Sequence, residues 1–228
     1  MAPVTALVIA AHPDDETFGA GGTLARLAQE GTQVHVLIMT NCGSGTNARY
    51  FGEQDPATVR REEARRAAET LGTHPPVFEP FRELELERFG LPALADRIAT
   101  VLHSVRPKLV LTHHWADAHQ DHRFVSEATR IATRLYTIDW PCRVLAFQYP
   151  GDPLFSVQPG VQFRPNVFME IAGGPLETKL KAVACYASEL RPPPHPRSLP
   201  AVRVIAETAG VAAGFEAAEA FELLWEKS

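Results

Sequence analysis

The sequence predicts an α/β fold: a single Rossmann-like domain of three layers, with a mainly parallel sheet between helices. Strand-like apolar runs alternate with segments of helical periodicity through the first two-thirds of the chain. Polar clusters follow several of these runs, at the carboxyl ends of strands where such sheets bind ligands. A chain of 228 residues with 45% hydrophobic residues suits one domain spanning residues 1–228.

The first half of the chain predicts strands and helices in strict alternation. Helices are indicated by apolar residues three or four positions apart, and glycines such as Gly31 and Gly72 indicate where they end. In order, we expect a strand at Val4–Ala11, a helix at Thr17–Glu30, a strand at Gln33–Thr40, a loop from Asn41 to about Pro56, a helix at Ala57–Leu71, a strand at Pro76–Phe81 and a helix at Leu91–Val105.

The second half continues the pattern less regularly, and we see no internal repeat and no domain boundary in it. In order, we expect a strand at Leu109–Thr112, a helix at Phe124–Tyr136, strands at Arg143–Tyr149 and Val167–Ile171, a helix at Leu176–Leu190, a proline-rich loop at Arg191–Pro200 and a closing helix at Phe215–Glu226.

Composition argues against several classes of protein. The net charge of −5 and the lack of a basic run give no reason to expect a nucleic-acid partner. The first apolar run is too short to span a bilayer, and no Lys or Arg precedes it as in a signal peptide. The three cysteines lie far apart, as is typical of reduced thiols in a cytoplasmic protein. A homo-oligomer is compatible with this composition.

A histidine and three carboxylates are crowded into five positions directly after the first predicted strand. They are His12, Asp14, Asp15 and Glu16, with Pro13 between them. Like charges this close repel, and buried carboxylates are costly without a partner, so packing does not require this arrangement. A divalent cation is the simplest partner. His12 and Asp15 are able to converge on one ion, which leaves Asp14 free to act on a bound water.

Another polar cluster follows the fourth predicted strand and reads HHWADAHQDH. Catalytic zinc usually takes three protein ligands and leaves a position for water. His119 and His122, three apart at the start of a helix, are able to face one cavity, one binding metal and the other facing substrate. Asp121 also suits a helix start as a structural charge, and His113 and Trp115 suit packing at a strand end. Two clusters at two strand ends nevertheless favour one metal site built from both.

These motifs resemble those of a known enzyme family. The sequence HPDDE at 12–16, followed by GGTL at 21–24, resembles the opening of the LmbE-like (PIG-L) zinc-dependent N-deacetylases. These enzymes remove acetyl groups from sugars of the N-acetylglucosamine type. The resemblance covers nearly the whole chain, through Arg60, Glu63, Ala67-Ala68, Leu71-Gly72, Arg106-Pro107, HQDH at 119–122, Lys181–Glu189 and Ala217–Phe221.

The resemblance implies a zinc site and a small-molecule amino-sugar substrate. His12, Asp15 and His122 would bind Zn²⁺, although Fe²⁺ or Co²⁺ would suit the same ligands. Zinc lowers the pKa of its bound water toward ~7. Asp14 would be the general base that takes this water's proton as it attacks the amide carbonyl.

The second motif implies the remaining catalytic roles. His119, in protonated form, would be the general acid or the partner of the oxyanion, and Asp121 would orient it. The residue between them is Gln120, where the family usually has proline. The three polar positions of the motif are intact despite this difference.

Substrate contacts are expected from two further residues. Arg60 resembles a substrate-contacting arginine, although a surface salt bridge with Glu63 would also explain it. Asn41, at the end of the second predicted strand, is placed to hydrogen-bond a sugar hydroxyl. The loop Pro194–Ser198 is either a stiff connector or a cover over the mouth of the site.

Three other functions stay open. Two histidines and one carboxylate also suit a non-haem Fe(II) oxygenase, whose expected scaffold is an all-β double sheet. A non-catalytic metal- or sugar-binding module would leave Asp14 and His119 dispensable. A nucleotide-binding loop is disfavoured, because GAGG at 19–22 does not match the usual glycine spacing and follows an acidic turn. No role is assigned to His113, His114, His195 or Cys42.

Overall fold

The computed structural model describes residues 4–41, 54–150 and 161–228, and within these ranges the chain forms seven strands and six helices. The strands are β1 (Thr5–Ala10), β2 (Gln33–Thr40), β3 (Val77–Phe81), β4 (Leu109–His113), β5 (Cys142–Phe147), β6 (Val167–Glu170) and β7 (Ala218–Lys227). The helices are α1 (Asp15–Gln29), α2 (Pro56–Leu71), α3 (Leu86–Val105), α4 (Gln120–Ala132), α5 (Gly174–Cys185) and α6 (Leu199–Ala213).

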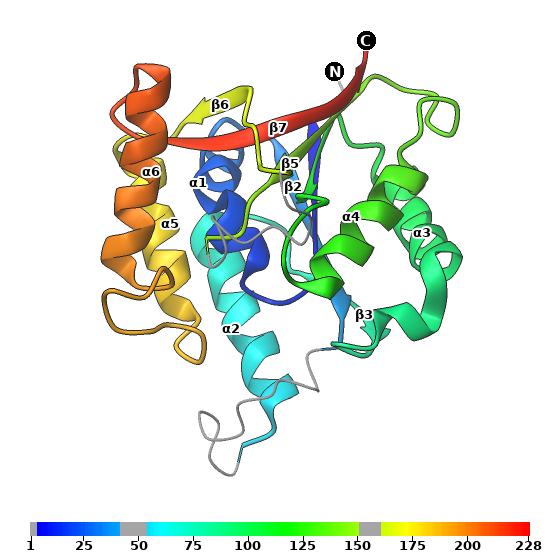
Figure 1. The fold of residues 1–228 in the computed structure, drawn as a ribbon, viewed down its shortest axis with the longest axis horizontal. Helices are drawn as coiled ribbons and strands as arrows, with labels where there is room; N and C mark the ends of the chain where they lie inside the picture. Colours follow the sequence, from blue (N-terminus) through cyan, green and yellow to red (C-terminus); the bar gives the residue numbers. More distant parts are fainter. Residues whose placement is uncertain (1–3, 42–53, 151–160) are drawn as a thin grey trace.

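The seven strands form one sheet in the order β3-β2-β1-β4-β5-β7-β6 (Figure 1). The first five strands in this order run parallel, and β7 runs antiparallel to both of its neighbours, β5 and β6. The predicted α/β, Rossmann-like fold is therefore confirmed. The chain builds the sheet outward from β1 in one direction and then from β4 in the other. Sheets of this kind bind ligands beyond the carboxyl ends of the strands at such a reversal.

Alternate residues of the central strands supply two separate cores, because successive side chains of a strand point to opposite faces. Leu7 and Ile9 of β1 pack with α3 and α4, whereas Ala6 and Val8 pack with α1, α2 and α5. Figure 1 shows these helices on the two sides of the sheet. In the described part of the chain, no helix is both long and apolar enough to cross a membrane.

The glycines of α1 allow this helix to lie very close to the sheet. A Cβ atom on Gly19 would lie 2.3 Å from the ring of Phe147 in β5. A Cβ atom on Gly22 would lie 2.6 Å from the side chain of Ile171. These glycines therefore serve the packing of the helix that carries the first polar motif. Their contacts do not indicate the phosphate site that a nucleotide-binding loop would need.

Two predictions for the last third of the chain are wrong. The closing helix predicted at Phe215–Glu226 is β7, which pairs with a strand on each side. The predicted loop Arg191–Pro200 ends early, because α6 begins at Leu199. Ser198 caps α6 by accepting a hydrogen bond from the Ala201 backbone N–H at 3.3 Å, and Pro200 lies in the first turn, where its missing N–H costs nothing.

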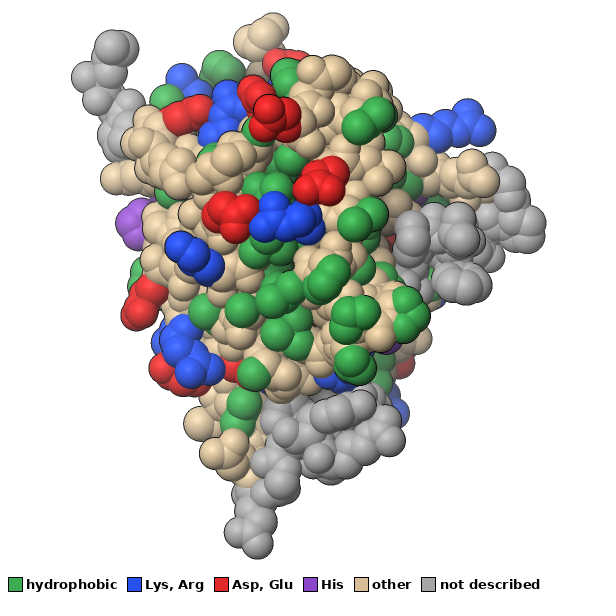
Figure 2. Space-filling view, turned by 90° about the vertical axis from the view of Figure 1, so that its left-hand side faces the viewer, with side chains coloured by type: hydrophobic (Ala, Val, Ile, Leu, Met, Phe, Trp, Pro, Cys, Tyr) green, Lys and Arg blue, Asp and Glu red, His purple; other side chains and the backbone are tan. Residues whose placement is uncertain are grey.

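The outer face of α6 is apolar. Figure 2 shows hydrophobic side chains gathered on the side of the molecule where α6 lies. Val204, Ile205 and Val211 of α6 and the following Phe215 are all exposed, with Val211 80% accessible. Only the inner face of α6, with Val202 and Ala206, is buried. Polar residues therefore do not cover this helix as they usually cover an outer helix.

Candidate active site

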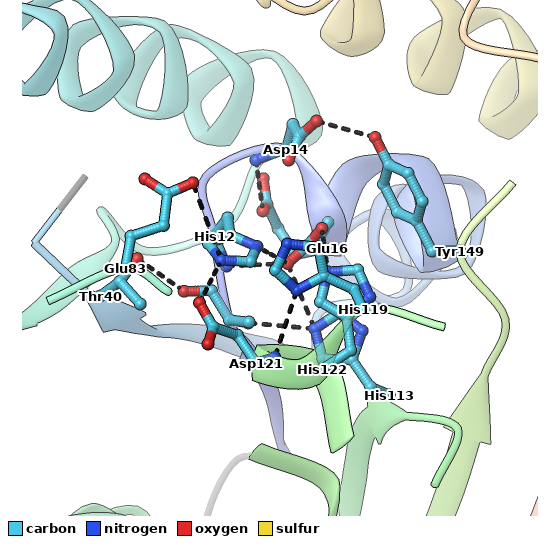
Figure 3. A network of polar contacts seen from close by, with 12 residues as sticks. His12, Asp14, Glu16, Thr40, Glu83, His113, His119, Asp121, His122 and Tyr149 are labelled. Atoms are coloured by element: carbon cyan, nitrogen blue, oxygen red, sulfur yellow. Dashed lines mark hydrogen bonds and ion pairs between the residues drawn. The ribbon is translucent and has the colours of Figure 1, made fainter. Parts of the chain in front are cut away.

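The two polar motifs meet because β1 and β4 are parallel neighbours, with Ile9 opposite Thr112. Both strands end at the same edge of the sheet, and both motifs start there. The first motif continues into α1 and the second into α4, which begins four residues earlier than predicted and so places His122 in its first turn. Figure 3 shows the side chains of both motifs converging on one small region.

The three predicted metal ligands lie against one another. His12 Nδ1 lies 3.3 Å from Asp15 Oδ2, and His122 Nε2 lies 3.3 Å from Asp15 Oδ1. All three residues are buried. Ligand atoms bound to one tetrahedral ion at about 2.1 Å lie roughly 3.4 Å apart. Each of these two distances is that of neighbouring ligands on one ion, although the three residues do not form one group whose ligand atoms all lie within 4.8 Å of one another.

Two carboxylates hold the histidine nitrogens that face away from Asp15. His12 Nε2 lies 3.0 Å from Asp121 Oδ2, and His122 Nδ1 lies 3.1 Å from Asp117 Oδ2. Metal-binding histidines usually donate their second ring N–H to a carboxylate in this way, which orients the ring and fixes its tautomer. The Asp121 carboxylate thus contacts His12, whereas the sequence suggested His119 as its partner.

The pKa shifts in the cluster show how strongly it holds positive charge. Burial lowers the pKa of His12, but hydrogen bonds with Asp121 and Asp15 raise it to about 9. Burial raises the pKa of Asp15, but the charges of His122 and His113 hold it well below its usual value. A carboxylate that stays ionised, together with the imidazole nitrogens around it, forms a suitable set of donors for a divalent cation.

Two further histidines line the same region. Among the described residues, two groups of three donors have their ligand atoms within 4.8 Å of one another; they share His122 and consist of His12, His119 and His122, and of Asp15, His113 and His122. The predicted set is divided between these two groups, so the hydrogen bonds of His113 and His119 decide which residues are free to bind a metal.

Judged by its hydrogen bonds, His113 is a buried residue that supports the cluster. Its Nε2 accepts a hydrogen bond from the Ala11 backbone N–H at 3.0 Å, so this nitrogen is already occupied. Its ring stacks on His122 with centroids 4.0 Å apart. Burial, together with the charge of His122, lowers the pKa of His113 to about 4. Sequence reasoning left this residue without a role, although its place directly after a buried strand was a signal.

His119 is the N-cap of α4 and faces the same region. Its Nδ1 accepts a hydrogen bond from the Asp121 backbone N–H at 3.2 Å, which leaves the proton of a neutral ring on Nε2. Burial, with the charges of His12 and His122, lowers its pKa to about 3. The ring is therefore neutral at physiological pH, whereas the sequence suggested a protonated His119.

Asp14 lies directly beside Asp15, one of the predicted ligands, and is also buried. Its backbone has a φ of 110°, which is strained for a residue other than glycine. Burial, with the charges of Asp15 and Glu189, raises its pKa well above the usual value. A raised pKa makes a carboxylate a stronger proton acceptor, which suits a general base.

Of the two predicted substrate residues, Arg60 is linked to the cluster through Glu83, whose Oε1 lies 3.8 Å from His12 Nε2. Arg60 is buried, with Nη1 2.9 Å from Glu83 Oε2 and Nε 3.7 Å from Glu189 Oε1. The alternative salt bridge with Glu63 is not its arrangement, since Glu63 accepts a hydrogen bond from the Ser188 N–H at 2.9 Å. Asn41 is held through its backbone, which pairs with Phe81. The rest of its loop, including Cys42, lies outside the described residues.

Two site residues, Tyr149 and Arg197, were not predicted, although the sequence offered the loop that carries Arg197 as a cover over the mouth of the site. Tyr149, two residues beyond β5, donates a hydrogen bond to Asp14 Oδ2 at 2.9 Å (Figure 3). Arg197, on the proline-rich loop, contacts Tyr149, and its Nη1 lies 2.5 Å from Glu189 Oε2. The backbone N–H of Arg197 also donates to His195 Nδ1 at 3.0 Å. The loop therefore delivers an arginine to the site.

Comparison with known proteins agrees with this arrangement. The model of the family "PIG-L: GlcNAc-PI de-N-acetylase" matches residues 7–133. An uncharacterized deacetylase of Escherichia coli, YaiS, is 35% identical over 80% of this chain and 90% of its own length. The diacetylchitobiose deacetylase of Thermococcus kodakarensis is 30% identical over 80% of this chain and 69% of its own length.

The fold is also found in an enzyme with another reaction. The crystal structure of GalB, the 4-carboxy-2-hydroxymuconate hydratase of Pseudomonas putida KT2440, superposes with a TM-score of 0.76 at 24% identity, over 99% of this chain and 98% of GalB. The two deacetylases confirm the prediction of an amide-hydrolysing enzyme. By the family match and by its identity to YaiS, the chain belongs to the GlcNAc-PI de-N-acetylase (PIG-L) family.

Proposed function

We propose that this enzyme is a zinc-dependent hydrolase that removes the N-acetyl group from an amino sugar of the N-acetylglucosamine type or its conjugate. The observation that carries the proposal is the position of Asp14. A buried carboxyl group with a raised pKa lies next in sequence to Asp15, which itself lies 3.3 Å from both His12 and His122. The proposal thus joins a metal-binding set to a base, which amide hydrolysis requires.

His12, Asp15 and His122 would hold the metal ion. Zinc bound by two imidazoles and a carboxylate supplies an activated water and polarises a carbonyl group. Fe²⁺ and Co²⁺ accept the same ligands, so the donor set favours zinc without requiring it. The non-haem oxygenase alternative loses support, because the scaffold is α/β.

Asp14 would move the proton in both halves of the reaction. Its carboxylate takes a proton from the attacking water. Its raised pKa then lets the carboxyl group keep that proton until the amine departs. Amines leave poorly unless protonated, so delivery of this proton to the nitrogen completes the cleavage. The neutral state of His119 makes Asp14 the better acid of the two.

His119 would stabilise negative charge on the substrate oxygen. The Asp121 backbone N–H holds Nδ1 as an acceptor, so Nε2–H is the donor left to the site. A fixed donor in a buried site stabilises a developing oxyanion without reorganisation. Neutral imidazole is sufficient for this role.

Arg60 and Asn41 would contact the sugar. The Arg60 guanidinium is held between Glu83 and Glu189, which together offer donors and acceptors of the kind that sugar hydroxyls need. The choice of an amino-sugar substrate follows the family and the relatives that deacetylate such sugars. The fold alone does not decide the reaction, because a hydratase shares it.

Release of primary amine from a panel of N-acetylglucosamine conjugates tests the proposal. We expect the zinc-loaded protein to release amine, and Asp14→Asn to bind zinc at one ion per chain but to turn over about 10²- to 10⁴-fold more slowly. Asp96→Asn, a change of the same kind on the exposed side of α3, is the matched control and should act as wild type.

Two results would contradict the proposal. An Asp14→Asn variant as active as wild type would show that Asp14 is not the base. A zinc-loaded protein that releases no amine from any conjugate, but hydrates an unsaturated dicarboxylate, would show that the reaction is that of the hydratase.

A further inference from the structure

We propose that Tyr149 is a positioning residue for the Asp14 carboxylate, holding one of its oxygens so that the other faces the reacting atoms. The proposal rests on the proposed function, in which Asp14 is the base. It concerns a residue 135 positions away in sequence, at the end of another strand.

The backbone of Asp14 is fixed on both sides. Its N–H donates to Glu16 Oε2 at 3.2 Å, and its carbonyl oxygen accepts from Thr17 N at 3.0 Å and Phe18 N at 2.8 Å. A residue other than glycine with a φ of 110° keeps this conformation only where its surroundings impose it. The freedom that remains is therefore rotation of the side chain.

The Tyr149 hydroxyl removes that freedom. It donates to Asp14 Oδ2 at 2.9 Å, and both residues are buried, 8% and 3% exposed. A carboxylate has two acceptor oxygens. Because Oδ2 is occupied by the hydroxyl, Oδ1 is the oxygen left to exchange a proton with water or amine.

The ring of Tyr149 is itself held by both motifs. It packs edge-on against Phe18 of α1, with centroids 5.7 Å apart, and against His122 of α4, with centroids 5.6 Å apart. Phe18 and Tyr149 also share an apolar cluster with Val183 and Val202. The hydroxyl is thus held at a fixed place relative to both Asp14 and the ligand His122 (Figure 3).

The proline-rich loop supports the tyrosine from outside. Arg197 contacts Tyr149, and Glu189 holds the guanidinium at 2.5 Å. Glu189 also lies 3.7 Å from Arg60. A continuous set of polar contacts therefore runs from the proposed sugar-binding arginine to the proposed base.

The contact itself is tested by ¹⁹F NMR of the zinc-loaded protein labelled with 3-fluorotyrosine. The chain has four tyrosines, and Tyr149→Phe identifies the resonance of Tyr149 by its loss. We expect Asp14→Asn to shift this resonance, because a neutral amide replaces the carboxylate beside the hydroxyl, and to leave exposed Tyr136 unchanged. An unshifted Tyr149 resonance would overturn the proposal whatever the activity.

The positioning role is tested by kinetics of Tyr149→Phe, which keeps the ring and removes only the hydroxyl. We expect kcat to fall about 10- to 100-fold, the cost of a misplaced catalytic group. We expect KM to change by less than about threefold and zinc stoichiometry to stay at one per chain, since neither depends on this hydroxyl. Tyr136→Phe, which removes an exposed hydroxyl, is the control and should behave as wild type.

The outcomes separate this inference from the proposed function. If wild type releases amine and Tyr149→Phe keeps its kcat within twofold, Tyr149 does not position Asp14, although the deacetylase assignment stands. A KM that rises while kcat is unchanged would also overturn the inference and would place Tyr149 in substrate binding. If wild type releases no amine, the proposed function fails, and the NMR experiment still decides whether Tyr149 holds Asp14.

Discussion

Asp117 and Asp121 contact two of the proposed metal ligands from the side that faces away from Asp15. Each carboxylate lies within 3.1 Å of the outward ring nitrogen of one histidine, Asp121 at His12 and Asp117 at His122. Asp117 also accepts a hydrogen bond from the His119 backbone N–H at 2.8 Å. Neither aspartate needs to touch the metal to affect how tightly it is held.

Asp117→Asn should therefore weaken zinc binding while the ligands stay in place. An asparagine has a single acceptor oxygen for the two donors and lacks the negative charge. We expect the affinity for zinc to fall about 10- to 100-fold, measured by competition with a chelator. Asp139→Asn, which alters an exposed aspartate, is the control. An affinity within twofold of wild type would show that Asp117 does not orient His122.

Local spacing was enough to propose three metal ligands, because they lie within two short motifs. His12 and Asp15 share one turn, and the structure brings His122 to them through the pairing of β1 with β4. Tyr149 carries no such signal, and for Arg197 the sequence offered only its loop, as a cover over the mouth of the site. A tyrosine beyond a strand and an arginine among prolines are ordinary residues in sequence, and only the folded chain brings them to Asp14.

At the level of elements, the sequence predicted the first six strands, β6 at one edge of the sheet included, and failed at β7, which lies between β5 and β6. The segment at Phe215–Glu226 is rich in helix-forming residues, but its backbone is needed as a strand between β5 and β6. Its burial also departs from the helical pattern. Glu219 is buried, accepts hydrogen bonds from Gly22 N and Thr23 N, and lies 2.5 Å from Lys179 Nζ. Tertiary pairing, which local pattern does not contain, decided this element.

The turn from α6 into β7 depends on Gly210. A Cβ atom there would lie 2.7 Å from the backbone of Ala217, which has no room to move aside. We expect Gly210→Ala to destabilise the protein by about 1–3 kcal/mol, as overpacking does. Gly174→Ala, where a Cβ meets nothing within 4 Å, should be neutral in the same urea titration. Equal stability of the two variants would show that α6 and β7 pack less closely than described.

The stability of the whole molecule depends on pH through the buried histidines His12 and His113. Zinc would compete with protons for the ring nitrogen of His12, a proposed ligand. The pKa of His12 is raised to about 9. A raised pKa in the folded state means that the stability from protonated His12 is full below about pH 6.5 and is lost as pH rises toward 9. His113, with a pKa lowered to about 4, acts oppositely: its contribution is lost as pH falls below 6.5.

The metal-free protein should consequently melt at its highest temperature near neutral pH and at lower temperatures at pH 5 and pH 9. With the proposed ligands, zinc would displace the His12 proton, so its apparent affinity should rise with pH by up to about tenfold per unit for each proton displaced. Calorimetry between pH 5 and 9 measures the first effect, and zinc titration between pH 6 and 9 measures the second. An affinity independent of pH in this range would show that His12 binds no proton there.

The backbone of Asp14 places stability and catalysis in opposition at a single position. A residue other than glycine in this conformation costs on the order of 1–3 kcal/mol, and burial of its carboxylate adds to that cost. Asp14→Gly would remove both penalties together with the base. A screen for heat tolerance alone would therefore not protect the proposed base, so thermal selection of this scaffold must be coupled to a screen for amine release.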